Sequence, residues 1–326
     1  MTALATIVLM VMLAFTGARA DGVGFRDIVV EVEGENLMTA LWYPANAPSG
    51  RTTIGLFTMN ATRGTPVGPG RYGLVLISHG TGGGRLNHRG TAIRLAESGY
   101  IVAAPAHGGD NWQDNRYSGT SANWRRRPRQ LGAVLEHLLG DAEFGRHIDP
   151  KRIGAVGHSA GGHSVLALIG GRSDMAMLAR HCTRHREKDP VFCGYGRPDE
   201  RAEGVMPDLS DRRVGAVVAV APVGALFGDG AFTGVEVPAQ IHRLEGDRVL
   251  RRPWHEDNIM KLMGGNASLV RHPQAHHFAF LSPFPDALIS EVGAPARDPA
   301  GFDRRAFLSK IDRRILRFFN GTLPGS

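Results

Sequence analysis

A serine between two glycines stands in a context that suits nucleophilic chemistry. Gly157-His158-Ser159-Ala160-Gly161 fits the pattern G-x-S-x-G, in which a serine occupies a sharp turn between a strand and a helix. The apolar run Ile153–Val156 precedes the motif, and the small-residue segment Gly161–Leu168 follows it. A strand and a helix in these places are what the motif requires. The pattern therefore predicts Ser159 as a nucleophile that attacks a carbonyl group.

A nucleophilic serine needs an acid and a base, and in folds with this motif the acid follows the serine first along the chain. The predicted strand Ala239–Leu244 leads into Glu245-Gly246-Asp247. We expect Asp247 to be the acid, because the turn that presents the acid usually begins with a glycine. Glu245 is the alternative.

Three histidines after the next predicted strand, Ala267–Arg271, are candidates for the base. His272 precedes a proline and is expected to belong to the end of the strand. His277 opens an apolar segment that reaches Leu281, and this buried setting suits an imidazole that must meet the nucleophile. We therefore expect His277 to be the base, with His276 as the alternative.

Attack on a carbonyl creates an oxyanion, which backbone N–H groups can stabilise. One donor is expected at Ala160, directly after the nucleophile. The other is expected at Thr81, in the glycine-rich loop His79–Gly84 that follows an earlier predicted strand. We expect His79 to hold this loop rather than to transfer a proton. A phosphate-binding loop is disfavoured, because no Lys-Ser/Thr pair follows the glycines.

Strand and helix patterns alternate along the chain, which is typical of an α/β fold with a mainly parallel sheet. Buried parallel strands are predicted at Tyr72–Ser78, Tyr100–Ala104, Ile153–Val156, Val214–Ala221, Ala239–Leu244 and Ala267–Arg271. The strands Ile28–Val32 and Met38–Trp42 are predicted to form an N-terminal hairpin. Helices are predicted at Gly90–Glu97, Pro128–Leu139 and Arg304–Asn320. We expect an α/β-hydrolase fold, with helices on both faces of the sheet and no linker dividing the chain.

Two segments interrupt this alternation. Gly50–Arg71 is predicted to be a loop, and the polar stretch Gly171–Arg213 is interpreted as a small cap insertion over the carboxyl edge of the sheet. The cap holds both cysteines, Cys182 and Cys193. In an oxidising compartment they are expected to form a disulfide, which would contribute about 3 kcal/mol in the chain-entropy model. Two free thiols are the alternative, and two cysteines are too few for a structural zinc site.

The first twenty residues resemble a secretory signal peptide. An almost entirely apolar run, Ala3–Phe15, is followed by small residues at Ala18 and Ala20, which fit the rule for signal-peptide cleavage. We expect residues 1–20 to be removed and residues 21–326 to form the hydrolase domain of an exported protein, periplasmic or secreted. A buried first strand is the alternative. No later stretch is long and apolar enough to predict a membrane helix.

The charge of the chain gives little functional information. Its 326 residues carry a formal net charge of +7, which can indicate a nucleic-acid partner. The basic residues are mostly spread singly, however, and the one cluster, Trp124–Arg129, is interpreted as the solvated start of a helix. We therefore expect no nucleic-acid partner, and nothing in the sequence predicts a cofactor, a metal ion or an oligomeric state.

Several segments together resemble the family of predicted dienelactone hydrolases, bacterial relatives of the platelet-activating-factor acetylhydrolases. The segments that carry the resemblance are Leu41–Pro44, Ile77–Thr81, Ile148–Ile153, Gly157–Gly162 and Ala275–Phe280. The resemblance runs from about Met38 to Leu281. It implies that Ser159, Asp247 and His277 form a triad, and that Thr81 and Ala160 supply the oxyanion hole.

Two features depart from this family. Dienelactone hydrolases proper use a cysteine as nucleophile, where this chain has Ser159, and the cap segment Gly171–Arg213 carries none of the motifs of the resemblance. We therefore expect a serine hydrolase that cleaves small-molecule carboxylic esters with short acyl chains through an acyl-enzyme. The alternatives are a thioesterase or peptidase of the same fold, or a non-catalytic binding protein that keeps the fold.

Overall fold

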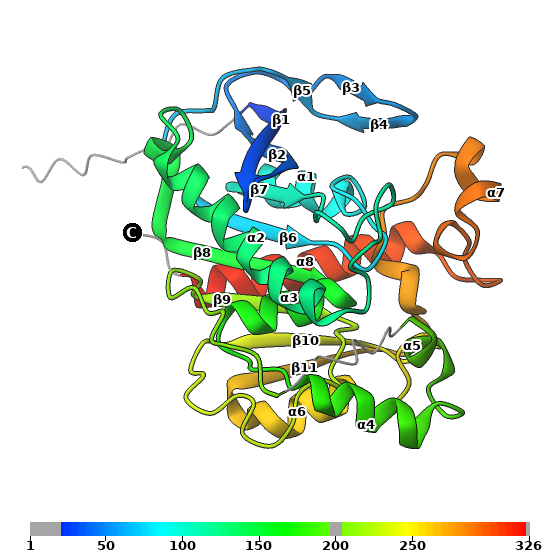
Figure 1. The fold of residues 1–326 in the computed structure, drawn as a ribbon. Coiled ribbons are helices and arrows are strands. Elements are labelled where there is room, and N and C mark those ends of the chain that lie inside the picture. The colour runs from blue at the N-terminus through cyan, green and yellow to red at the C-terminus, as the bar shows by residue number, and fades with distance from the viewer. Residues whose placement is uncertain (1–20, 196–203, 324–326) are drawn as a thin grey trace, which may run out of the picture.

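A central sheet organises the molecule. A computed structural model describes residues 21–195 and 204–323, and among these residues nine strands form one sheet in the order β11-β10-β9-β8-β6-β7-β2-β1-β5 (Figure 1). From β11 to β7 in this order neighbouring strands run parallel, whereas β2 pairs antiparallel with both β1 and β7. The strands are β1 Gly22–Val32, β2 Glu35–Ala45, β5 Thr62–Arg63, β6 Tyr72–Ser78, β7 Tyr100–Pro105, β8 Ile148–His158, β9 Ala216–Val220, β10 Ala239–Leu244 and β11 Ala267–His272.

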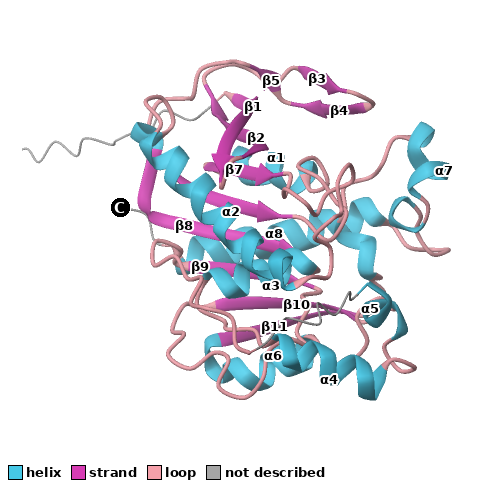
Figure 2. Cartoon of the chain, viewed as in Figure 1, coloured by secondary structure: helices cyan, strands magenta, loops and turns pink. Residues whose placement is uncertain are grey.

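Helices cover both faces of the sheet, which explains why β6, β7 and β9 are buried along their whole length (Figure 2). One face packs against α2, α3 and α6, and the other against α1 and α8. These helices are α1 Arg89–Glu97, α2 Ser121–Gly140, α3 Ala160–Leu168, α6 Glu256–Met263 and α8 Arg304–Thr322. The predicted α/β-hydrolase architecture, a mainly parallel sheet between two layers of helices, is confirmed.

Short helices connect the main elements. They are η1 Gly145–His147, η2 Gly264–Asn266, η3 His277–Phe280, η4 Asp286–Leu288, α7 Ile289–Val292 and η5 Ala294–Ala296. The first residue of η3 is the histidine predicted to be the base, so a change of backbone direction after β11 places it. No helix in the described part of the chain is long and apolar enough to cross a membrane.

Helix α2 begins earlier than predicted. The expected start at Pro128 is wrong, because Thr120 caps the helix by accepting a hydrogen bond from the N–H of Asn123 (3.3 Å) and the helix then runs through the proline. The interpretation of Trp124–Arg129 as a solvated helix start is also wrong. Trp124 is buried, and Arg127 has no exposed surface.

The segment predicted to be a loop between residues 50 and 71 contains a second, two-stranded sheet. Strands β3 (Arg51–Ile54) and β4 (Phe57–Asn60) pair antiparallel. The hairpin was not predicted because each strand has only four residues, too few for an alternating pattern to stand out. In Figure 1 the hairpin projects from the top of the molecule toward the side where the parallel strands end.

The predicted cap segment contains two helices, α4 (Met175–His185) and α5 (Pro190–Tyr195). A disulfide between Cys182 and Cys193 joins them, so the predicted bond is confirmed. Both helices bury apolar side chains in a third cluster, separate from the two that flank the sheet. Within the predicted cap, residues 196–203 lie outside the described residues, as does the predicted signal peptide, residues 1–20.

Candidate active site

Ser159 lies in strained backbone between β8 and α3. Its φ and ψ are 56° and −118°, in a region that side-chain-bearing residues rarely occupy. The flanking glycines explain how the turn is accommodated. A Cβ on Gly157 would lie 2.0 Å from the carbonyl oxygen of Gly161, and a Cβ on Gly161 would lie 2.0 Å from the carbonyl oxygen of Ser78. Only glycine therefore fits at positions 157 and 161.

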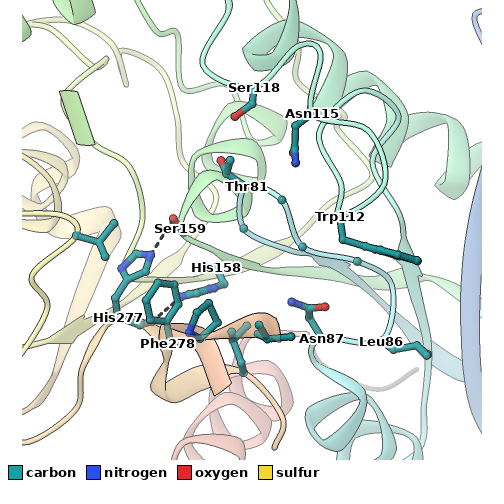
Figure 3. A pocket seen from close by; sticks show the side chains of 18 of the residues that line it. Thr81, Leu86, Asn87, Trp112, Asn115, Ser118, His158, Ser159, His277 and Phe278 are labelled. Carbon is teal, nitrogen blue, oxygen red and sulfur yellow. Dashed lines mark hydrogen bonds between the residues drawn. The ribbon is translucent and has the colours of Figure 1, made fainter. Parts of the chain in front are cut away.

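The structure brings Ser159, His277 and Asp247 together in one hydrogen-bonded line, and Figure 3 shows the contact between Ser159 and His277. The Nε2 atom of His277 lies 3.1 Å from the Oγ of Ser159, and its Nδ1 lies 2.6 Å from the Oδ2 of Asp247. A carboxylate accepts hydrogen bonds, so Nδ1 carries the proton and the Nε2 lone pair faces the serine hydroxyl. The other carboxylate oxygen accepts from the backbone N–H groups of Val249 and Leu250 (2.7 and 2.9 Å), which fixes the carboxylate.

The alternatives weighed from the sequence lie elsewhere. Glu245 forms an ion pair with Arg271 (2.5 Å), and His276 contacts Asp298 (2.9 Å). His272 contacts another buried histidine, 2.9 Å away. The structure therefore gives each of these three side chains a partner other than Ser159.

The loop after β6 has one peptide group held in a defined direction. The Nε2 atom of His79 accepts from the backbone N–H of His107 (3.0 Å), so its Nδ1 carries the proton and donates to the carbonyl of Gly80 (2.7 Å). The N–H of Gly83 donates to the same carbonyl (3.1 Å). In a trans peptide the C=O and N–H point in opposite directions. The N–H of Thr81 is thereby directed away from His79.

This loop lies close to the nucleophile. A Cβ on Gly80 would be 3.2 Å from the Cβ of Ser159, and Figure 3 shows Thr81 beside the serine. Burial, and next the charge of Arg127, lowers the pKa of His79 to about 3. The imidazole is therefore neutral and acts as a hydrogen-bonding spacer, in agreement with the prediction that His79 holds the loop.

A buried ion pair forms hydrogen bonds with the backbone of the glycine-rich loop after β6. Arg127 and Asp110 have no exposed surface and lie 2.6 Å apart. Asp110 also accepts from the backbone N–H of Gly82 (3.1 Å), and Arg127 donates to the carbonyl of His79. The pair thus holds the backbone on both sides of the Gly80–Thr81 peptide.

Sequence analysis missed Arg127 and Asp110. A signal was present for Arg127, because it lies three residues after Trp124 and four before Leu131, on the apolar stripe of α2. A charged residue on such a stripe is buried only with a partner. The partner lies in the loop after β7, and the sequence carries no comparable signal for it.

On the opposite side of the candidate site, a second buried aspartate connects α4 with the segment after β10. Asp189 accepts from His181 and His255, each at 2.9 Å, and from the backbone N–H of Arg251 (3.1 Å). Burial opposes ionisation of Asp189, but these hydrogen bonds outweigh it and lower its pKa to about 2.

The same three side chains have the residue types of a metal site, but their hydrogen bonds indicate otherwise. The N–H of Gly224 donates to the Nδ1 of His255 (3.2 Å). The proton of His255 is therefore on Nε2, where it is donated to Asp189 rather than replaced by a metal. This arrangement fits a hydrogen-bonded contact that holds α4 against the segment after β10.

A cavity of about 700 Å³ opens above Ser159 and His277. Its walls come from the tip of the β3–β4 hairpin, the glycine-rich loop, α4, α5 and the segment that follows η3. A volume of this size is typical of a site for a small organic molecule. Ser159 and His277 therefore face a substrate-sized space.

Part of the chain matches the model of a known protein family. A model of the dienelactone hydrolase family matches residues 59–197. The predicted resemblance to dienelactone hydrolases is confirmed. The matched stretch contains Thr81 and Ser159 and ends before Asp247 and His277. The contacts in the structure, rather than the family match, connect Asp247 and His277 to Ser159. The relation to platelet-activating-factor acetylhydrolases stays a prediction.

Individual relatives resemble the chain over very different extents. Lipase 1 from Moraxella sp. (strain TA144) is 47% identical over 52 residues, which are 16% of this chain and 16% of that protein. A ferulic acid esterase from Streptomyces cinnamoneus superposes with a TM-score of 0.66 at 20% identity, covering 95% of this chain and 92% of that one. A dienelactone hydrolase-like promiscuous phosphotriesterase from metagenomic libraries superposes with a TM-score of 0.55 at 15% identity, covering 92% and 99%. Similarity at such low identities supports the fold.

Proposed function

We propose that this protein is a serine hydrolase that cleaves carboxylic esters. The observation that carries the proposal is the line from Ser159 through His277 to Asp247, with contacts of 3.1 and 2.6 Å at the floor of the cavity. The similarity to dienelactone hydrolases, and to proteins named a lipase and a ferulic acid esterase, agrees with ester chemistry.

The first half of the reaction forms an acyl-enzyme. The Nε2 of His277 takes the proton of Ser159 as the serine oxygen attacks the ester carbonyl, and Asp247 stabilises the imidazolium that results. The backbone N–H groups of Thr81 and Ala160 stabilise the oxyanion of the tetrahedral intermediate. When this intermediate collapses, the C–O bond to the alcohol breaks and His277 gives its proton to the leaving oxygen.

The second half releases the acid. His277 takes a proton from water, the hydroxide attacks the acyl carbonyl, and the serine oxygen leaves with the proton that His277 returns. Because a protonated imidazole cannot accept a proton, both halves of the reaction require His277 in its neutral form.

Hydrolysis of 4-nitrophenyl esters by residues 21–326 tests the proposal. Ser159→Ala should lower kcat by roughly four to six orders of magnitude while the circular dichroism spectrum stays unchanged. His276→Ala is the matched control for His277→Ala, since His276 is adjacent in sequence and contacts Asp298 instead.

Near-normal turnover by Ser159→Ala would show that the nucleophile is assigned wrongly. Cleavage of thioesters or amides in place of oxygen esters would identify a thioesterase or a peptidase. If the protein cleaves none of these substrates and does not react with a fluorophosphonate, it is a binding protein.

Export and the division of the chain are part of the same proposal. We infer that residues 1–20 direct the chain to the periplasm or the medium, that residues 21–326 form one hydrolase domain, and that 171–213 form its cap. The disulfide between Cys182 and Cys193 agrees with an oxidising compartment. Mass spectrometry of the protein purified from its native cells is expected to find a mature N-terminus at Asp21.

A further inference from the structure

The cavity extends along the sheet edge to both sides of Ser159. On one side its wall is the tip of the β3–β4 hairpin with the segment that contains α7, and on the other side it is α4, α5 and the loop after β10. Figure 1 shows these two walls at opposite ends of the edge at which the parallel strands end, with β8 between them. An ester carbonyl at Ser159 therefore has space for a group on its acyl side and for another on its alcohol side.

Both walls are mainly apolar. The hairpin side presents Leu56, Phe57, Trp112, Phe284 and Val292, and the cap side presents Leu178, Phe192, Tyr195, Val249 and Leu250. Large apolar side chains also reach solvent at the cavity, since Leu56 is 55% exposed, Trp112 68% and Tyr195 56%. Isolated exposed apolar residues are ordinary, whereas several around one opening indicate a binding surface for an apolar group.

None of the described residues that line the cavity offers a free cation to an anionic substrate. Apart from histidines, the charged side chains among its described lining residues are Arg85 and Glu291. Arg85 is bound to Asp27 at 2.8 Å, and Glu291 would repel an anion. A carboxylate on the substrate would lose hydration without gaining an oppositely charged partner among these residues.

We propose that the substrate is an uncharged ester with a bulky apolar group on each side of the scissile carbonyl. The proposal rests on the proposed function and names its substrate class. It departs from the expectation of short acyl chains, because a volume of about 700 Å³ leaves most of both walls out of contact with an acetyl ester.

Two series of esters test the two sides separately. In the acyl series, 4-nitrophenyl acetate, butyrate, octanoate and 2-naphthoate share one alcohol. In the alcohol series, methyl, benzyl and naphthylmethyl butyrate share one acid and have alcohols of similar acidity. We expect kcat/KM to rise by about tenfold or more along each series, since about 1.4 kcal/mol of apolar contact corresponds to tenfold. Nitrophenyl hemisuccinate, which matches the butyrate but carries a carboxylate, should react at least about tenfold more slowly than the butyrate.

Variants at exposed residues assign each wall without endangering the fold. Trp112→Ala and Tyr195→Ala should each lower kcat/KM for the bulky members of one series by about fivefold, and for the smallest members by less. Val191→Ala is the control, because Val191 is an exposed residue of α5 that does not line the cavity.

The outcomes separate this proposal from the proposed function. Ser159-dependent cleavage of acetate and methyl esters with no gain from larger groups would overturn the substrate class and leave the serine esterase intact. Faster reaction of the hemisuccinate would also overturn it. Failure of every ester would overturn both. If Trp112→Ala and Tyr195→Ala affect the same series, the two-sided arrangement is wrong.

Discussion

Two buried aspartates lie on opposite sides of the candidate site, and they are held in different ways. Asp110 is paired with Arg127, whose charge does not depend on pH over the ordinary range, and the pair contacts the backbone around Thr81. Asp189 is held by His181 and by His255 of the segment after β10. The first arrangement fixes a loop that touches the reacting atoms. The second fixes the wall of a cavity.

This difference predicts that damage to the Asp110 side reduces catalysis and stability together, whereas damage to the Asp189 side reduces mainly stability. A buried ion pair does not by itself stabilise a fold strongly, but removing one partner leaves a charge without compensation. The two aspartates can therefore be compared by substitutions that each remove the contacts of one aspartate.

The largest effect is expected from Arg127→Met. It leaves Asp110 unpaired in the interior and frees the carbonyl of His79, so it should lower the free energy of unfolding by about 3 to 5 kcal/mol. The kcat for 4-nitrophenyl acetate should fall with little change in KM, because the loop with Thr81 acts on the transition state. Urea unfolding and steady-state kinetics at 15 °C measure both.

Arg129→Met is the matched control for this substitution. Arg129 lies on the same helix and contacts Glu33 at 3.3 Å with about half of its side chain exposed, so its loss should cost less than about 1 kcal/mol. An Arg127→Met enzyme that loses stability but keeps its kcat would mean that the ion pair has no part in placing the loop.

A smaller effect, dependent on pH, is expected from His163→Phe. His163 is fully buried, both of its ring nitrogens lack hydrogen-bond partners, and its ring stacks on Phe227. Burial, and next the charge of Arg127, lowers its pKa to about 3. Below about pH 6.5 the unfolded chain therefore binds a proton at this position that the folded chain does not, and wild-type stability is lost as the pH falls.

The phenylalanine removes this proton uptake. The stability of His163→Phe relative to wild type should therefore improve by about 2 kcal/mol between pH 7 and pH 5. Urea midpoints at pH 7, 6 and 5 measure the change. A constant difference between the two proteins at all three values would contradict the neutral, buried state of His163.

The smallest effect is expected from Asp189→Asn. The amide oxygen can still accept from both histidines, which share Oδ2, but the charge is lost and the amide nitrogen then faces the N–H of Arg251. The free energy of unfolding should therefore fall by about 1 kcal/mol. The kcat for the acetate ester should stay within about twofold of wild type, and any change should appear in the KM of bulky esters. A drop in kcat like that of Arg127→Met would remove the distinction between the two aspartates.

Much of this arrangement could be predicted from the sequence because its signals are local. The glycines around Ser159 mark a turn that only glycine permits, and the order of acid and base follows from the order of the strands. The choice of Asp247 over Glu245 rested on one glycine. In the structure Asp247 contacts His277, whereas Glu245 forms an ion pair with Arg271.

Other features escaped prediction because they depend on contacts between distant segments. The contact of Asp110 with Gly82 joins the loops after β7 and β6, and no spacing in the chain shows that these loops meet. The walls of the cavity likewise come together from a hairpin near residue 55 and helices beyond residue 175. Their chemistry became visible only when the elements were placed in space.

The contact between the backbones of Gly157, Gly161 and Ser78 has a consequence for how this protein can change over evolutionary or laboratory time. Because a side chain at either glycine would collide with main-chain atoms, no repacking of neighbours can make room for one. The β3–β4 hairpin and the disulfide-linked helices line the same cavity without contributing to the contacts among Ser159, His277 and Asp247, so they can vary while the chemistry is preserved. A mutagenesis library directed at these two segments should therefore alter which esters are accepted while retaining most folded members, whereas one directed at residues 157–161 should yield few.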